Sequence, residues 1–447
     1  MIALIQARGR RILHSADPVL ARFKTGIFWS VGNVVLSQPL ALLSSIVAAR
    51  VLGIDGFGQF SFIRSTVLML GVFAGTGLGI AATRHVAEFR HVDPARAGRI
   101  VSLLITVGAI CGSLVFLLTY LLAPEISHLI HNDSLPVLLT LASPLLLLNI
   151  LNGIYTGVLV GLEKYKLIAV LGVLEGVCTL MFVTVGAWIS QAPGAVLGMV
   201  ASALVLAIAR HIITRQESAT MGILLNTRNI LLEVRLLRRV ALPAVLIAAS
   251  IQPFEWFGRV LISSGGDRVG EVGIFSAVQS WAQFMTVLPA QVTLPSMAIL
   301  ASLYAAGDYG KFRKLILTSL KVVGILSIAV ALPLFIFSEW IMALYGPEFL
   351  NGVPALRVML LAYSVAVATM VFTEALISAD RVWLQTLQKL LWGVTMIFAA
   401  YFLSPMGAVG LAISYALANF LFLVVQAVAV RRVFSSLPLS CSCGTRM

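Results

Sequence analysis

The chain has 447 residues, of which 60% are hydrophobic and only 11% are charged, and its mean hydropathy is +1.00. So little polar surface excludes a water-soluble globule. The formal net charge of +13 does not indicate nucleic-acid binding, because Lys and Arg fall in short clusters between apolar runs. The composition therefore predicts a polytopic membrane protein with one basic face.

Residues 1–24 are expected to form a basic, weakly amphipathic arm on the cytoplasmic leaflet. Its basic residues are Arg8, Arg10, Arg11, Arg22 and Lys24. The apolar run that follows, residues 27–51, is longer than the core of a signal peptide, which has about 7 to 15 residues. We therefore expect this run to be retained as the first membrane span.

Apolar stretches of about 20 residues, the length that crosses a bilayer as a helix, recur along the whole chain. Twelve are found, at residues 27–51, 59–83, 100–122, 135–160, 167–189, 194–209, 240–263, 272–302, 315–337, 355–378, 387–403 and 408–430. The predicted fold class is an all-α integral membrane protein with about twelve transmembrane helices.

The distribution of basic residues agrees with this number of spans. If the amino terminus is cytoplasmic, 25 of the 31 Lys and Arg residues fall in segments on the inner side, while the predicted outer loops contain only Arg268. Positive charge in membrane proteins is concentrated in cytoplasmic loops. We therefore expect a multi-pass protein with both termini in the cytoplasm.

The two halves of the sequence repeat each other at a nearly constant offset. Gln38-Pro39 recurs as Gln252-Pro253, and Gly58 corresponds to Gly273 at almost the same separation along the chain. A repeat of six spans preserves orientation, so the halves should be related by an axis along the membrane normal. This predicts two six-helix lobes, residues 25–209 and 240–431, around a central cavity, with a cytoplasmic linker at 210–239 and a tail at 432–447.

The segment after the first span carries a family resemblance. Residues 49–60 read ARVLGIDGFGQF, and a Gly-rich second span follows, in which Gly71, Gly75 and Gly79 leave one face open to a neighbouring helix. An ARxLGxxxFGxF hairpin at this position resembles the polysaccharide flippases. Their superfamily also contains the multidrug and toxin extrusion transporters, and the resemblance covers about residues 22–432.

The resemblance implies a flippase and not an enzyme. Its substrate would be a polyprenyl-pyrophosphate-linked oligosaccharide, moved across a prokaryotic inner membrane during synthesis of a polysaccharide such as lipopolysaccharide. The implied partners are this anionic lipid-linked glycan, membrane lipids, a polysaccharide polymerase and glycosyltransferases.

Charged residues at membrane depth are candidates for the substrate cavity, because such charge is costly unless it is paired or faces water. Arginine matches the oxygen atoms of phosphate groups. The candidates are Arg50, Arg64, Glu255, Arg259 and Arg357. Glu255 precedes Arg259 by four residues on one helical face, which predicts an ion pair with either a static or a gating role.

Two further carboxylates and two prolines suggest how transport works. Glu175 and Glu374 lie inside spans without an obvious local partner, so they are candidate sites for a coupling ion, H⁺ or Na⁺. No other cofactor and no metal site is predicted. Pro39 and Pro253 should bend spans one and seven at equivalent places, as hinges for alternating access.

Two other functions remain open at this stage. A cation-coupled drug exporter of the same superfamily would need aromatic cavity walls and an essential carboxylate. A membrane glycan polymerase would need catalytic acids or histidines in an outer loop, and His128, His131 and Asp133 are the cluster to test.

Overall fold

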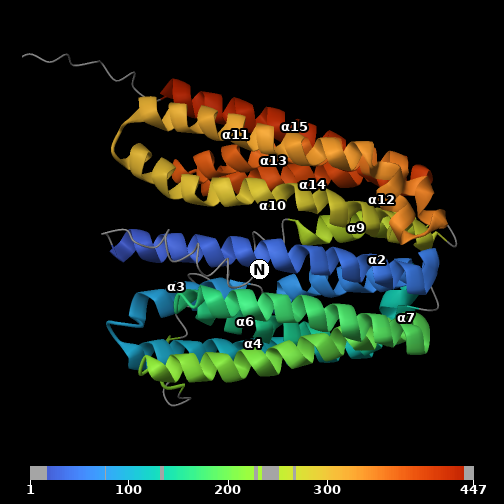
Figure 1. Cartoon of the computed structure of the whole chain (residues 1–447), viewed down its shortest axis with the longest axis horizontal. Coiled ribbons are helices and arrows are strands. Elements are labelled where there is room, and N and C mark those ends of the chain that lie inside the picture. The colour runs from blue at the N-terminus through green and yellow to red at the C-terminus, as the bar shows by residue number, and fades with distance from the viewer. Residues whose placement is uncertain are drawn as a thin grey trace, which may run out of the picture. The chain divides into compact units, whose positions relative to one another are not determined.

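The computed structural model describes residues 18–75, 77–130, 135–225, 230–233, 251–264 and 268–436. These residues form helices joined by short turns and contain no β-strand (Figure 1). The longer elements are α2 (Pro18–Gly75), α3 (Gly77–Phe89), α4 (Pro94–Ile130), α5 (Leu135–Ala142), α6 (Pro144–Gly161), α7 (Tyr165–Thr220), α9 (Gln252–Ser263), α10 (Val269–Ala305), α11 (Tyr309–Ile336), α12 (Ser338–Tyr345), α13 (Val353–Ser378), α14 (Val382–Leu403) and α15 (Gly407–Ser436). The short 3₁₀ helices are η1 (Ile230–Glu233), η2 (Pro347–Gly352) and η3 (Ser404–Met406). The predicted all-α class is confirmed.

Seven segments of the described chain are long and apolar enough to cross a membrane. Three of them contain two predicted spans each, namely Phe28–Val72, Tyr165–Thr220 and Trp383–Arg432. The first breaks at Gly53, where φ is 69°, and the second breaks at Ser190 and Gln191. A left-handed φ favours glycine, so Gly53 provides the turn between the first two spans that the sequence predicts.

The chain divides into two compact units. One comprises Met1–Leu52 and Ile63–Ala249, and the other comprises Gly53–Phe62 and Ser250–Met447. The hairpin segment 53–62 therefore belongs with the second unit. There, the ring of Phe57 lies 6.3 Å from that of Tyr345 and 6.0 Å from that of Phe349.

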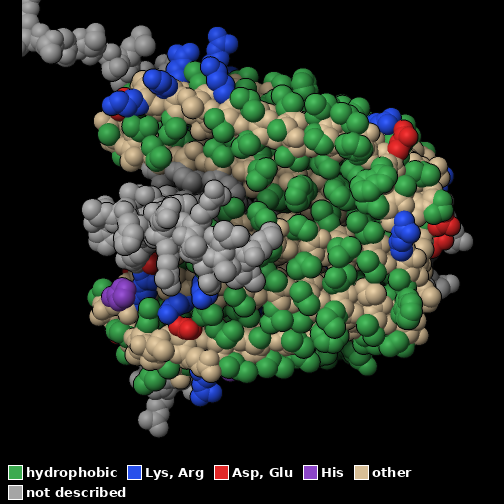
Figure 2. Space-filling model, in the orientation of Figure 1, with side chains coloured by type: hydrophobic (Ala, Val, Ile, Leu, Met, Phe, Trp, Pro, Cys, Tyr) green, Lys and Arg blue, Asp and Glu red, His purple; other side chains and the backbone are tan. Residues whose placement is uncertain are grey.

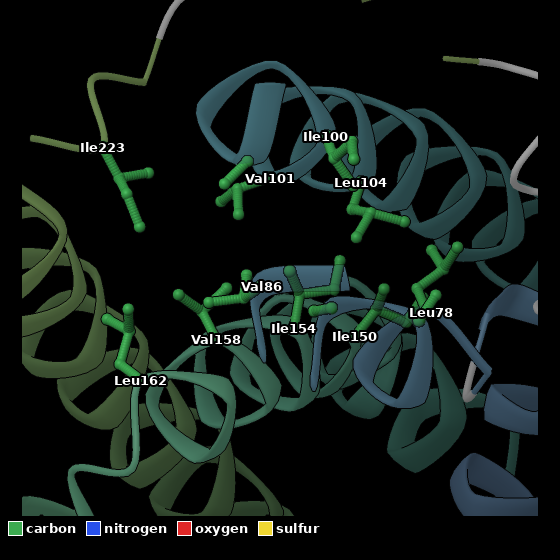
Figure 3. Packing of buried hydrophobic residues seen from close by; sticks show 13 residues of the cluster. Leu78, Val86, Ile100, Val101, Leu104, Ile150, Ile154, Val158, Leu162 and Ile223 are labelled. Atoms are coloured by element: carbon green, nitrogen blue, oxygen red, sulfur yellow. The ribbon is translucent and has the colours of Figure 1, made fainter. Parts of the chain in front are cut away.

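The core of the first unit joins α3, α4 and α6. Figure 3 shows Leu78 and Val86 of α3, Ile100 and Leu104 of α4, and Ile154 of α6 pointing toward one another. Ile223, which follows α7, is also buried in this cluster. The chain beyond α7 is therefore fixed to the unit by apolar burial.

Small residues let α3 and α6 approach closely. A Cβ atom at Gly79 would meet the carbonyl of Gly153, and one at Gly157 would meet the carbonyl of Gly79. The hydroxyl of Thr83 donates to the carbonyls of Gly79 (3.1 Å) and Gly157 (3.0 Å). Of the three glycines in the predicted stripe, Gly79 makes this approach, whereas a Cβ at Gly71 would meet no atom within 4 Å.

We predict that Gly157→Ala destabilises the protein by about 1–3 kcal/mol, because the added methyl group forces two backbones apart. Gly153→Ala is the matched control on the same helix, since a Cβ there meets nothing within 4 Å. Thermal unfolding in detergent should show a lower midpoint for Gly157→Ala and an unchanged or higher one for the control. Equal midpoints for the two variants would contradict the close approach.

The internal repeat is visible in the helix caps. Asp93 before α4 accepts a hydrogen bond from the backbone of Arg96 (2.9 Å), and Asp308 before α11 accepts one from Lys311 (3.1 Å). Both are N-caps that satisfy an unpaired amide, and their separation along the chain equals that of Gly58 and Gly273. Hydrogen bonds from the Lys311 side chain and backbone lower the pKa of the half-exposed Asp308 carboxyl.

A second repeated feature is the turn between the fourth and fifth spans of each half. Glu163 has φ of 60° and Asp380 has φ of 58°, both in the left-handed region. In each turn the next residue closes a helix end, with Lys164 N donating to Leu159 O (3.0 Å) and Arg381 N to Leu376 O (2.9 Å). The same turn at nearly the same offset supports the predicted parallel repeat.

In the second unit, α10, α11, α13, α14 and α15 pack alongside one another (Figure 1). Figure 2 shows hydrophobic side chains over the middle of this unit's visible face, with Lys and Arg toward its ends. At the end where α10 turns into α11 and α13 into α14, the exposed basic residues are Lys311, Arg313, Lys314, Arg381, Arg431 and Arg432. An apolar belt between charged ends is the expected surface of a helical unit in a bilayer.

The helix α7 continues to Thr220, past residue 210 where the predicted linker begins. Beyond it, the buried carboxylate of Glu233 lies 3.2 Å from the Arg96 guanidinium and 3.6 Å from that of Arg99. Both arginines belong to α4, so part of the linker is bound to the first unit by charge as well as by Ile223. Of the predicted arm, residues 1–24, the structure describes only 18–24, which begin α2. The boundaries of the two lobes, 25–209 and 240–431, stay predictions.

Candidate functional site

A cavity of about 310 Å³ lies within the second unit, where the residue before α9 and the helices α9, α10, α13, α14 and α15 surround it. Its polar lining residues are Glu255, Thr286, Tyr363, Thr369, Thr373, Glu374, Lys389, Tyr415 and Asn419. Trp392 and Phe422 contribute apolar area. Apolar walls with a few converging polar groups are typical of a small-ligand site.

Hydrogen bonds hold three of the surrounding helices in register. The indole nitrogen of Trp392 on α14 donates to Oδ1 of Asn419 on α15 (2.8 Å). Asn419 Nδ2 in turn donates to the carbonyl of Ala362 on α13 (3.2 Å). Because buried polar groups are costly when unpaired, this chain of bonds fixes one wall of the cavity.

A second group of amides closes the wall beside Thr373. Gln426 Nε2 donates to Thr373 Oγ1 and to Gln385 Oε1, each at 3.0 Å. Gln385 Nε2 donates to the same Thr373 hydroxyl at 2.9 Å. Gln385 and Gln426 are both buried, so α13, α14 and α15 are tied together at two levels.

Lys389 brings a positive charge to the cavity. Its Nζ atom lies 4.6 Å from the ring centroid of Phe422, a cation–π distance, and Lys389 lines the cavity together with Glu255. The Glu255 carboxylate also faces the amide of Gln279 and the hydroxyl of Tyr415. The cavity therefore contains opposite charges on facing helices.

Arg259 lies on the same helix as Glu255 and is buried, with 8% of its surface exposed. Its Nη1 donates to the main-chain carbonyl of Glu255 at 3.0 Å, and its Nη2 donates to Oε1 of Gln279. The guanidinium carbon lies 5.8 Å from the Phe275 ring centroid. Glu255 and Arg259 lie close together, as the sequence predicts. The guanidinium of Arg259 donates to the main-chain carbonyl oxygen of Glu255, however, and not to its carboxylate.

The two candidate ion-coupling carboxylates have different surroundings. Glu374 on α13 lines the cavity and faces the hydroxyl of Thr293. Glu175 lies in the other unit, on the first part of α7, and its carboxylate is 2.6 Å from the Arg210 guanidinium. Arg210 is 35 residues away on the second part of the same helix, which explains why no local partner is evident in the sequence.

The remaining candidate arginines do not line this cavity. Arg357, at the start of α13, donates to Ser338 Oγ and to Glu339 Oε1, both at 3.0 Å, and lies over the Phe335 ring. Arg50 and Arg64 are exposed on α2. Arg268 donates weakly to the carbonyl of Pro405 at 3.4 Å. The cavity thus brings together Glu255, Glu374 and the neighbouring Arg259.

The two candidate hinge prolines both lie in helices that the structure describes. Pro39 lies inside α2, whose interior break is at Gly53, and Pro253 lies in the first turn of α9. His131, Asp133 and the side chain of His128 lie outside the described residues. In the part of the chain that the structure describes, no group of three or more His, Cys, Asp or Glu residues is arranged to hold a metal ion.

Comparison with known proteins identifies the family. The model of the family described as "Polysaccharide biosynthesis protein" matches residues 23–301. The chain belongs to this family. This confirms the resemblance seen in the ARxLGxxxFGxF hairpin.

Two curated relatives of this family member are named "EPS I polysaccharide export inner membrane protein EpsE". The protein from Ralstonia nicotianae is 24% identical over 400 residues, which cover 86% of this chain and 89% of the relative. The protein from Ralstonia solanacearum is 22% identical over 418 residues, covering 89% of this chain and 92% of the relative.

Solved structures show the same fold at low sequence identity. An inward-facing multidrug resistance MATE family transporter of the MOP superfamily is 15% identical, with a TM-score of 0.78, covering 92% of this chain and 99% of that one. The lipid II flippase MurJ, in an inward closed conformation, is 14% identical, with a TM-score of 0.73, covering 92% of this chain and 90% of that one. This polysaccharide biosynthesis protein therefore has the fold of these transporters.

Lys389 is the functional candidate that sequence analysis missed. The predicted span began at residue 387, which placed Lys389 at a membrane boundary, whereas α14 begins at Val382 and carries it two turns into the helix. The apolar residues Val382, Trp383 and Leu384, which follow Arg381 directly, were the signal that the span starts earlier.

Proposed function

We propose that this protein is a flippase that moves polyprenyl-pyrophosphate-linked oligosaccharide units from the inner to the outer leaflet of a prokaryotic inner membrane, for polysaccharide biosynthesis. The observation that carries the proposal is the family match over residues 23–301 in a chain with the MurJ-like transporter fold. The fold supports this proposal, because two repeats that rock against each other would expose a substrate site alternately to each side of the membrane.

The charge of the substrate fits the basic residues at membrane depth. A pyrophosphate group is anionic, and guanidinium groups bind phosphate oxygens in pairs. Arg50, Arg64, Arg259 and Arg357 are the proposed contacts, with Glu255 held beside Arg259 through its carbonyl oxygen. The protein acts in this proposal as a transporter and not as an enzyme, and the glycosyltransferases and polymerase of the same pathway are its proposed partners.

Both termini are proposed to lie in the cytoplasm, because the exposed basic residues of the second unit gather at the end where α15 finishes. A cysteine placed at Arg431 should then react with a membrane-impermeant reagent in inside-out vesicles and not in intact cells. Reaction in intact cells instead would reverse the orientation.

A cation-coupled drug exporter is the second candidate function. It is favoured by the aromatic cavity walls, formed by Tyr363, Trp392, Tyr415 and Phe422, together with the carboxylate of Glu374. The family match favours the flippase.

A cellular experiment separates the two functions. In a host whose polysaccharide synthesis depends on this protein, its depletion should cause the lipid-linked oligosaccharide to accumulate on the inner leaflet, with no change in the efflux of cationic dyes. Loss of dye efflux, reproduced by Glu374→Gln and without accumulation of the lipid-linked sugar, would establish the drug exporter instead.

A further inference from the structure

The cavity in the second unit is balanced in charge by its own side chains. Two carboxylates, Glu255 and Glu374, line it. Two cations accompany them, Lys389 in the lining and Arg259 one helical turn from Glu255. The formal charges of these four groups sum to zero, which matters because uncompensated charge at membrane depth is costly.

The rest of the lining would otherwise suit a small, hard cation. Glu255, Thr286, Thr369, Tyr415 and Asn419 all present oxygen atoms, the ligand type that such cations require. The hydroxyl of Tyr415, a residue that is only 2% exposed, faces the Glu255 carboxylate but lies outside hydrogen-bonding geometry with every described residue. It therefore has a lone pair available for a cation or a donor inside the cavity.

Lys389 is placed to supply that cation. It lies on α14, one turn before Trp392, with its ammonium over the Phe422 ring, and it lines the same cavity as Glu255. An ammonium group carries three donors on a flexible four-carbon stem, so it can reach more than one oxygen without leaving the helix. Among the described residues no ion pair within 4.0 Å joins it to a carboxylate, and its described contact is the Phe422 ring.

We infer that the Lys389 ammonium is the resident cation of this cavity, so that the site does not bind Na⁺ in the native protein and acquires a Na⁺ site when Lys389 is removed. This deepens the proposed function, because it assigns a tethered positive charge to the place where a coupling ion would bind. It does not depend on the identity of the transported lipid, and the experiment that tests it measures binding without transport.

The experiment measures thermal unfolding of the full chain in detergent, with NaCl replacing choline chloride at constant ionic strength. The unfolding midpoint of the native protein should not respond to Na⁺. That of Lys389→Met should rise saturably, by about 2 °C or more, because a ligand that binds only the folded state stabilises it. Lys389→Arg should not respond, since it keeps the charge.

The double variant Glu255→Gln/Lys389→Met provides the sharpest control. Its four groups are again neutral in sum, so the response to Na⁺ gained by Lys389→Met should disappear. Lys321→Met removes an exposed lysine of α11 in the same unit and should behave as the native protein.

A saturable response of the native protein to Na⁺ that Glu255→Gln abolishes would overturn the inference, even if Lys389→Met failed to fold. A folded Lys389→Met variant without any response would overturn it as well. Neither result would bear on whether the protein flips a lipid-linked oligosaccharide, which is measured separately.

Discussion

Arg90→Met should destabilise the protein by about 3 kcal/mol, the largest effect expected of a single substitution in the first unit. Arg90 follows α3 directly and is 7% exposed. Its Nη1 donates to the carbonyl of Gly161 at 2.9 Å, and its Nη2 lies 2.5 Å from the carboxylate of Glu163. Methionine fills the space but removes both of these hydrogen bonds to the α6–α7 turn.

The matched control is Arg84→Met, because Arg84 lies on α3 itself and is exposed. Monodispersity after heating in detergent distinguishes the two variants: Arg90→Met should aggregate at a lower temperature, while Arg84→Met should follow the native protein. If both variants aggregated at the same temperature as the native protein, the buried Arg90 contacts would not contribute to stability.

Arg259→Gln should reduce transport by roughly tenfold or more, because it removes a buried guanidinium that joins two helices. The substitution frees Oε1 of Gln279 and the carbonyl of Glu255, and it leaves the cavity with one negative charge in excess. Arg259→Lys keeps the charge but lacks the planar fork that reaches both acceptors, so its transport should be intermediate. Rates are measured in vesicles with equal amounts of inserted protein.

Arg268→Gln is the control for this prediction, since Arg268 is exposed and its contact with Pro405 is long. Arg357→Gln should have a smaller effect than Arg259→Gln, because the Arg357 guanidinium is already bound by Glu339. Replacing Arg50, Arg64, Arg259 and Arg357 together should abolish transport while the protein still inserts into the membrane. Normal transport by a quadruple variant that inserts into the membrane would show that these four arginines are not required for transport.

Hydropathy was sufficient to predict the helical class, because a bilayer requires long apolar helices wherever the chain crosses it. The repeat was also readable, since Gly58 and Gly273 have the same offset as the capping residues Asp93 and Asp308. Local constraints of this kind leave a signature in the sequence itself.

The cavity was not readable to the same extent. Glu175 pairs with Arg210 across the break in α7, and Lys389 contacts Phe422 on a different helix. Such contacts depend on how the helices pack. Inspection of a single sequence does not reveal which residues on distant segments will contact each other. The helix α14 also begins five residues before the predicted span. Lys389 therefore lies inside the helix and not at a membrane boundary, as the sequence analysis had placed it.

The most direct test is translocation in proteoliposomes that contain only this protein and a polyprenyl-pyrophosphate-linked oligosaccharide. The lipid-linked sugar is placed in one leaflet, and its appearance in the other is followed with a membrane-impermeant enzyme that modifies the sugar. We expect movement with the native protein and none with the quadruple arginine variant. Export of a cationic dye by the same vesicles, without movement of the lipid-linked sugar, would contradict the proposed function.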